Sequence, residues 1–473
     1  MAKNNPSSDG DNNRDPFEEM FRHLSQNGFF PAGAGQGNFD PQSLGLDPEE
    51  LSKMGMNLDS AMLSGIFASV SSMMKSGSTA EPVNWDLARQ HAQQMIAQGK
   101  DPAVTSNQKA AVLDARQLAD LWLDPVTSFE RPTSQTEAWT KAEFIEHSFA
   151  VFQEIAGPIA SSMSEAMNDS MDAQMPEEIK TLLGGQTNIL SGLGGMMFGM
   201  MAGQSVATLA SEVVSSADIG IPLAQGRSAL LPQGVAAFGQ GLEIPAQEVM
   251  LYLAVREAAL TRLYRANPWL REDIIDLIKR YARGIRVDIE RMQSAAQDID
   301  PMNPEALQEA IVADIFTPQN SEDQQLALER LENLLALVEG WVTVVTEQAS
   351  QNLPMAAQLA ETMNRRHANG GPAEHLFASL VGLELHPRLN REAAEFWRHY
   401  GSQKGTAARD ELWAAPETLP TTAELKDNKA YQQRTELLSA SEDEFNAALE
   451  KLLAGGYDQT EQTDNPDTPP ENQ

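Results

Sequence analysis

Two stretches of this chain, 249–255 and 334–345, are apolar on every face of a helix. A helix that is hydrophobic all round is buried in a core or in a membrane. The first stretch lies in a predicted helix over 245–267. Pro245 suits its first turn, and the helix ends before Pro268 because a residue that precedes proline disfavours the α region. We expect these two helices to form the centre of the fold.

The rest of the pattern predicts more helices and few strands. Val, Ile and Thr runs of strand length are scarce, and 219–223 is a candidate strand. Apolar residues recur at helical spacing in several further segments, which are 85–98, 105–123, 139–169, 269–297, 321–351 and 354–367. The predicted fold class is therefore mainly α, a multi-helix core with disordered N- and C-terminal tails.

The segment 189–214 has the composition of either a membrane span or a packed core helix. Its uninterrupted apolar part is only about 15 residues, fewer than the roughly 18–20 that cross a bilayer. Gly195, Gly199 and Gly203 recur every four residues, a stripe that allows another backbone to approach closely. We therefore predict a close-packed core helix and no membrane span.

Composition divides the chain into four segments. Residues 1–46 are rich in Asn, Gly, Asp and Pro and are predicted to be disordered. A Met-rich amphipathic helix and a linker follow over 47–81. The helical core is expected over 82–425, and 426–473 is expected to be an acidic, mostly disordered tail.

Charge and cysteine content narrow the classes of function. The 473 residues carry 67 acidic and 34 basic side chains, a formal net charge of −33. Such a field repels nucleic acid and anionic membranes, so we expect no nucleic-acid partner. The absence of cysteine excludes disulfides and thiolate metal sites. The N-terminal residues lack the apolar core of a signal peptide, which predicts a soluble, cytoplasmic protein.

Each of the two apolar helices contains charged residues whose burial requires an explanation. Arg256 and Glu257 interrupt the first, and Glu339 interrupts the second. Buried charges are costly unless they are paired or bound to a metal. In an HExxH zinc protease, two histidines at i and i+4 bind the ion and the glutamate is the general base. Here that frame has Arg256 and Leu260 at the two ligand positions, and neither residue type binds zinc.

Several long strings resemble the bacterial zincin-like metallopeptidase family. They are PVNWDLA, LLPQGVAAFGQGLEIPAQEVMLYLAVREAALTRLYRANPWLR, LLALVEGWVTVV, GGPAEHLFASLVGLELHPR and RDELW, which together span roughly 82–425. Members are usually described as zinc-dependent metalloproteases or hydrolases without an established substrate. The resemblance implies a helical zincin-like core with zinc as cofactor, Glu257 at the general-base position and Glu339 at the third-ligand position. In the branch this chain resembles, the first histidine is commonly arginine and the second is often kept, whereas here the second is Leu260.

The seven histidines do not supply a substitute motif. His367, His375, His386 and His399 lie in the C-terminal part of the core, but no two of them share i,i+4 spacing. Surface or capping roles are the simplest interpretation of them, and a non-standard metal site among them is the alternative.

Two hypotheses of function follow. In the first, the protein is a pseudoenzyme that binds an unknown protein or peptide, and Arg256 replaces the metal as the buried cation and pairs with Glu339, Glu257 or both. In the second, it is an active metal-dependent hydrolase or peptidase with Glu257 as general base and Glu339 as a metal ligand. A third, purely structural role would work through the terminal segments.

Overall fold

The structure is a computed structural model of the chain. It describes residues 83–133, 136–174, 188–224, 226–283, 285–287, 316–318, 321–381, 389–439 and 450. The predicted disordered segment 1–46 and the Met-rich helix over 47–81 lie outside the described residues, as does most of the predicted tail beyond 439.

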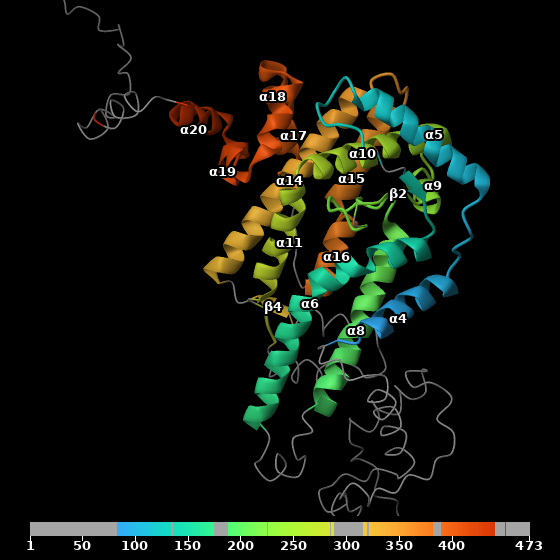
Figure 1. Ribbon diagram of the computed structural model, residues 1–473, viewed down its shortest axis with the longest axis vertical. Helices are drawn as coiled ribbons and strands as arrows, with labels where there is room; N and C mark the ends of the chain where they lie inside the picture. The colour runs from blue at the N-terminus through green and yellow to red at the C-terminus, as the bar shows by residue number, and fades with distance from the viewer. Residues whose placement is uncertain are drawn as a thin grey trace, which may run out of the picture.

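Most of the described chain is helical, as the sequence predicted (Figure 1). In chain order the larger helices are α4 (Trp85–Gln98), α5 (Ser106–Leu123), α6 (Lys141–Gln174), α8 (Asn188–Glu212), α9 (Pro232–Phe238), α10 (Ala246–Ala266), α11 (Pro268–Arg283), α14 (Glu322–Ala349), α15 (Ala356–Ala368), α16 (Pro372–Val381), α17 (Asn390–Lys404) and α20 (Asn428–Ser439). Shorter helical turns are α18 (Thr406–Glu411), η2 (Leu412–Ala414), η3 (Pro416–Thr418) and α19 (Thr422–Lys426). The strands are β1 (Thr136–Ala138), β2 (Ser228–Leu230), β3 (Ile285–Val287) and β4 (Phe316–Pro318).

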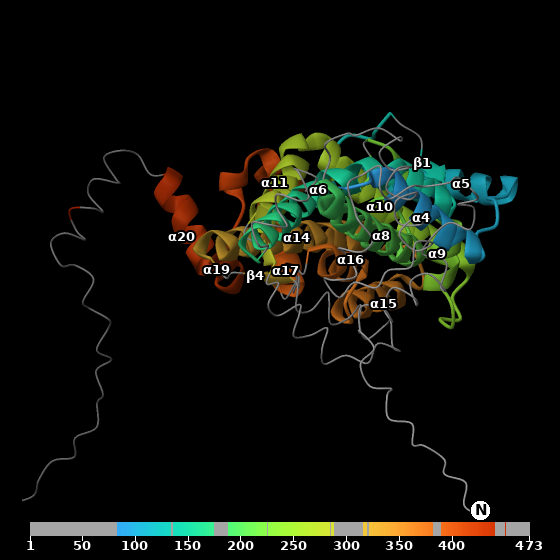
Figure 2. The same ribbon diagram turned by 90° about the horizontal axis from the view of Figure 1, so that it is seen from below.

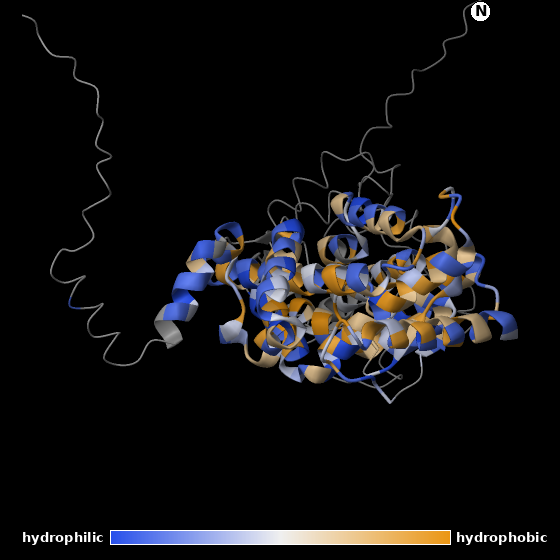
Figure 3. Cartoon of the chain, turned by 90° about the horizontal axis from the view of Figure 1, so that it is seen from above, coloured by the Kyte–Doolittle hydropathy of each residue, from blue (hydrophilic) through white to orange (hydrophobic). Residues whose placement is uncertain are grey.

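The two helices predicted to be buried form the centre of the body. Helix α10 packs against both α5 and α14, and most of its residues from Val249 to Tyr264 are buried. Helix α14 packs in turn against α11 and α17, and α11 also lies beside α6 (Figure 2). Hydrophobic positions gather within the helical body and hydrophilic ones along its outer helices (Figure 3). The prediction of a central pair of apolar helices is confirmed.

Helix α8 is a close-packed core helix. It contacts α4, α6 and α16. A Cβ atom on Gly203 would lie 2.4 Å from the carbonyl oxygen of Ala88, and one on Gly199 would lie 3.1 Å from that of Asn84. The glycine stripe therefore lets α4 approach the backbone of α8. None of the helices in the described ranges combines the length and the apolar character that crossing a bilayer demands.

The strands are short, and two predicted boundaries were wrong. Strands β1 and β2 pair in parallel, and β3 and β4 pair antiparallel. The candidate strand 219–223 is a turn, because Gly220 adopts a φ of +77° and the backbone folds back on itself. The helix predicted over 269–297 ends at Arg283, since the β-branched and apolar residues of β3 pair with β4 instead.

The C-terminal helices pack onto α14 and extend past the expected start of the tail. The Trp397 and Trp413 rings stack 5.2 Å apart between centroids. Asp410 accepts hydrogen bonds from Trp341 and Thr127, which ties this region to α14 and to the segment after α5. Helix α20 lies inside the segment expected as tail, and its Tyr431 is only 3% exposed.

Candidate functional site

Arg256 and Glu339 form a buried ion pair between α10 and α14. The Nη2 atom of Arg256 donates to both carboxylate oxygens of Glu339, at 2.8 Å to Oε1 and 2.7 Å to Oε2. The contact uses one guanidinium nitrogen, not the two-nitrogen fork that arginine often presents to a carboxylate. The pairing of Arg256 with Glu339 is confirmed.

The pair is charged on both sides. Burial alone would raise the pKa of Glu339, but the Arg256 guanidinium and the hydrogen bonds from Arg256 and His367 hold that pKa well below its ordinary value. Burial likewise opposes the charge on Arg256, and the adjacent Glu339 carboxylate outweighs it and raises the arginine pKa. Each partner therefore stabilises the ionised form of the other in a site with little water.

Two further side chains approach Glu339. The hydroxyl of Thr343, one turn later in α14, lies 3.1 Å from Oε1. His367, in the last turn of α15, places Nδ1 at 3.3 Å from the same oxygen. A surface or capping role was expected for His367, whereas it lies against Glu339. No spacing signal could have found it, because it reaches Glu339 from a separate helix.

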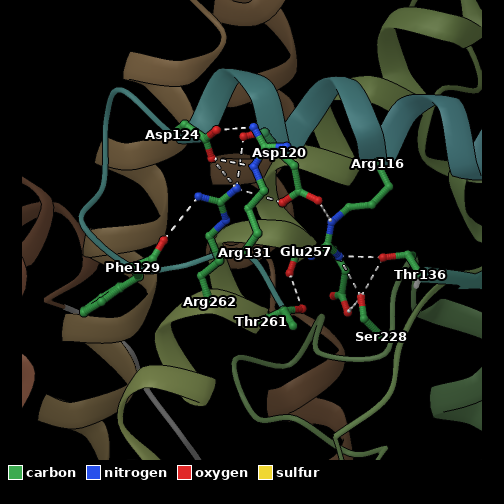
Figure 4. Close-up of polar contacts among 10 residues, drawn as sticks. All are labelled: Arg116, Asp120, Asp124, Phe129, Arg131, Thr136, Ser228, Glu257, Thr261 and Arg262. Carbon is green, nitrogen blue, oxygen red and sulfur yellow. Dashed lines mark hydrogen bonds and ion pairs between the residues drawn. The ribbon is translucent and has the colours of Figure 1, made fainter. Parts of the chain in front are cut away.

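Glu257 contacts the turn after α8 and strand β2 instead, and Figure 4 shows its carboxylate beside Ser228 of β2. Its Oε1 accepts hydrogen bonds from the hydroxyls of Ser216, at 2.6 Å, and Ser228, at 3.1 Å. Its Oε2 accepts one from the backbone N–H of Ala217 at 3.3 Å. Glu257 is 1% exposed, and burial raises its pKa. Adjacent residues on a helix lie on different faces, so Arg256 and Glu257 serve separate environments.

A basic side chain from α5 completes the environment of Glu257. Arg116 donates from Nη1 to Thr136 at 2.5 Å and to Ser228 at 3.1 Å, and from Nε to Asp120 at 3.0 Å (Figure 4). Its positive charge opposes the effect of burial on the Glu257 pKa. The same acidic face of α5 holds Arg262 of α10, since Asp120 accepts from it at 2.9 Å. This network joins α5, α10 and the β1–β2 pair.

The donor set beside Arg256 does not fit a zinc ion. Structural and catalytic zinc sites take at least three protein ligands at about 2.0–2.3 Å. Leu260, at the position of a second histidine, is 4% exposed and offers no lone pair. Both oxygens of Glu339 already contact a guanidinium, which repels a second cation. No cluster of three or more His, Cys, Asp or Glu able to hold a metal is found among the described residues.

A second arginine pair lies close to the first. Arg366 of α15 contacts both carboxylate oxygens of Asp218, at 2.9 and 2.6 Å. Its Nη2 also donates to the backbone carbonyl of Glu212 at the end of α8, at 2.8 Å. The Asp218 charge outweighs burial and raises the pKa of Arg366. Because Arg366 directly precedes His367, this pair fixes the end of α15 against α8.

Comparisons with known proteins agree with this architecture. The model of a family described as zincin-like metallopeptidase matches residues 83–431. A solved structure from Chloroflexus aurantiacus, described as "a putative hydrolase with a novel fold", matches with a TM-score of 0.53 and 15% sequence identity. The match covers 75% of this chain and 99% of that one, and at this identity it concerns the fold alone. No curated protein sequence matches the chain.

Proposed function

The chain belongs to the zincin-like metallopeptidase family, and we propose that it is a non-catalytic binding member of that family. The observation that carries this proposal is the contact of the Arg256 guanidinium with both carboxylate oxygens of Glu339. Arg256 occupies the position of the first histidine ligand in the HExxH frame, and Glu339 occupies the position of the third ligand. A permanent organic cation there balances the carboxylate, but it cannot polarise a substrate or activate water as a metal does.

The position of Glu257 supports the same conclusion. A general base must lie within hydrogen-bond reach of the proton it removes. The Glu257 carboxylate is buried and accepts from Ser216, Ser228 and Ala217. It therefore holds β2 and the turn after α8 in place, and we assign it the vestigial general-base position. We infer a protein or peptide as partner, in the cytoplasm.

Thermal unfolding with and without zinc tests the proposal. A ligand that binds only the folded chain raises its melting temperature. We expect the same melting temperature in dilute zinc and in a chelator for the wild type, and a zinc-dependent rise for the double variant Arg256→His, Leu260→His. A zinc-dependent rise in the wild type that Glu339→Ala removes, while Glu347→Ala on the exposed face of α14 keeps it, would overturn the proposal.

One arrangement favours a second candidate, an active metal-dependent hydrolase. His367 Nδ1 and the Glu339 carboxylate lie 3.3 Å apart, so a nitrogen and an oxygen ligand would face one ion if Arg256 turned away. Family membership and the "putative hydrolase" description of the Chloroflexus aurantiacus protein point the same way. In this alternative Glu257 is the general base and Glu339 a metal ligand. It requires zinc-dependent hydrolysis that is lost in both Glu339→Gln and His367→Ala.

A further inference from the structure

A groove lies between α8 and α16, beside the Arg366–Asp218 pair. Its volume is about 370 Å³, at the lower end of the roughly 300–1,000 Å³ typical of ligand pockets. Apolar side chains form much of its wall, namely Met201, Leu209 and Leu376. Thr208, Glu212 and His375 provide polar groups. The groove therefore combines an apolar wall with a few polar groups, one of them a carboxylate.

The acidic group of the groove is accessible. Glu212 Oε2 lies 3.1 Å from Nδ1 of His375, and the two side chains are 35% and 54% exposed. The backbone carbonyl of Glu212 accepts from Arg366, so its main chain is fixed while its carboxylate faces the groove.

We propose that this groove binds a peptide segment in which an apolar side chain adjoins a lysine or arginine. The proposal rests on the non-catalytic binding role proposed above and names its ligand class. The lining on α8 runs from Met201 to Glu212, about three turns or roughly 16 Å. That length matches about five residues of extended peptide.

The negative charge of the protein and of the groove favours a basic ligand. The net charge of −33 disfavours an acidic peptide everywhere on this protein. In the groove itself, an ammonium or guanidinium group displaces His375 and forms a charge-assisted hydrogen bond with Glu212. The apolar neighbour packs against the partly exposed Met201, and methionine adapts to side chains of different shape.

Saturation-transfer NMR with the full chain and two blocked pentapeptides tests the proposal. The probes are acetyl-Ala-Leu-Lys-Leu-Ala-amide and its counterpart with Glu in place of Lys. We expect the Lys peptide to bind about two- to fivefold more tightly than the Glu peptide, the scale of one partly exposed ion pair. Glu212→Gln should remove most of that preference, whereas Glu361→Gln, an exposed acid on α15, should leave it unchanged.

A variant whose side chain fills the groove provides a second test of the proposal. Thr208 is exposed on α8, so Thr208→Trp adds bulk to the groove without displacing the core, and circular dichroism checks its fold. Loss of Lys-peptide binding in Thr208→Trp supports the proposal. Equal binding of both peptides, no binding of the Lys peptide, or binding that Thr208→Trp leaves intact overturns it. These outcomes do not involve zinc, so a failed groove and a failed non-catalytic assignment are distinguishable.

Discussion

Arg256 and Glu257 are neighbours in the sequence, yet their charges are satisfied on different sides of α10. Arg256 donates to Glu339 on α14, whereas Glu257 accepts from Ser216 and Ser228 near β2. A metalloprotease needs the equivalents of these two residues to act on one water molecule. In this chain they hold two different parts of the fold.

The first prediction concerns the cost of breaking the Arg256–Glu339 pair. Arg256→Met leaves the Glu339 carboxylate buried without its cation, so the free energy of unfolding should fall by about 3–5 kcal/mol. The double variant Arg256→Met, Glu339→Leu should lose less than the two single changes together, because no lone charge is left. Urea unfolding measures all three. Arg398→Met, which breaks an exposed pair with Glu347, is the control and should cost below about 1 kcal/mol.

The second prediction is an acid-dependent loss of stability from Glu339. Its folded pKa is lowered from 4.5. The stability that Glu339 contributes is therefore fully present above pH 4.5, the pKa of the unfolded chain. It is lost as the pH falls toward the lower pKa of the folded chain. The stability difference between wild type and Glu339→Gln should shrink as the pH falls from neutral to about 3. A difference that stays constant over this range would show that Glu339 is not ionised in the folded chain.

The third prediction has the opposite sign and concerns Glu257. Its folded pKa is raised from 4.5 by burial. As the pH rises above 4.5, the unfolded chain loses this proton more readily than the folded chain, so the wild type loses stability relative to Glu257→Gln. Urea unfolding of both proteins at several pH values measures the effect. Parallel pH profiles for the two proteins would contradict it.

The fourth prediction tests the contact between α14 and α17. A Cβ on Gly340 would lie 2.7 Å from backbone and side-chain atoms of Ala393. Gly340→Ala should therefore push the helices apart and cost about 1–3 kcal/mol. Gly157→Ala in α6 is the control, since no atom beyond its own chain neighbours and helix backbone lies within 4 Å of its added Cβ. That change should shift the free energy of unfolding by less than about 1 kcal/mol, because the helical preference for alanine is opposed by the Pro158 ring that follows it. Equal effects of the two changes would contradict close packing at Gly340.

The sequence pattern was sufficient for the centre of the fold. The stretches 249–255 of α10 and 334–345 of α14 are apolar on all faces, so their burial and the need of Arg256 for a buried acidic partner follow from solvation alone, whereas the choice of Glu339 over Glu257 does not. The sequence pattern could not identify contacts between residues that lie far apart in the chain. His367 reaches Glu339 from α15, and Ser216 reaches Glu257 from a turn, and neither position carries a periodic signal. The end of α11 at Arg283 depends on the pairing of β3 with β4, which comes from a distant part of the chain.

The central claim is that Arg256 stands where a member of this family would hold a metal. Elemental analysis of the full chain, purified without added metal or chelator, tests it most directly, with Glu339→Ala analysed in parallel. We predict no stoichiometric zinc in either protein. Near-stoichiometric zinc in the wild type that disappears in Glu339→Ala would contradict the claim.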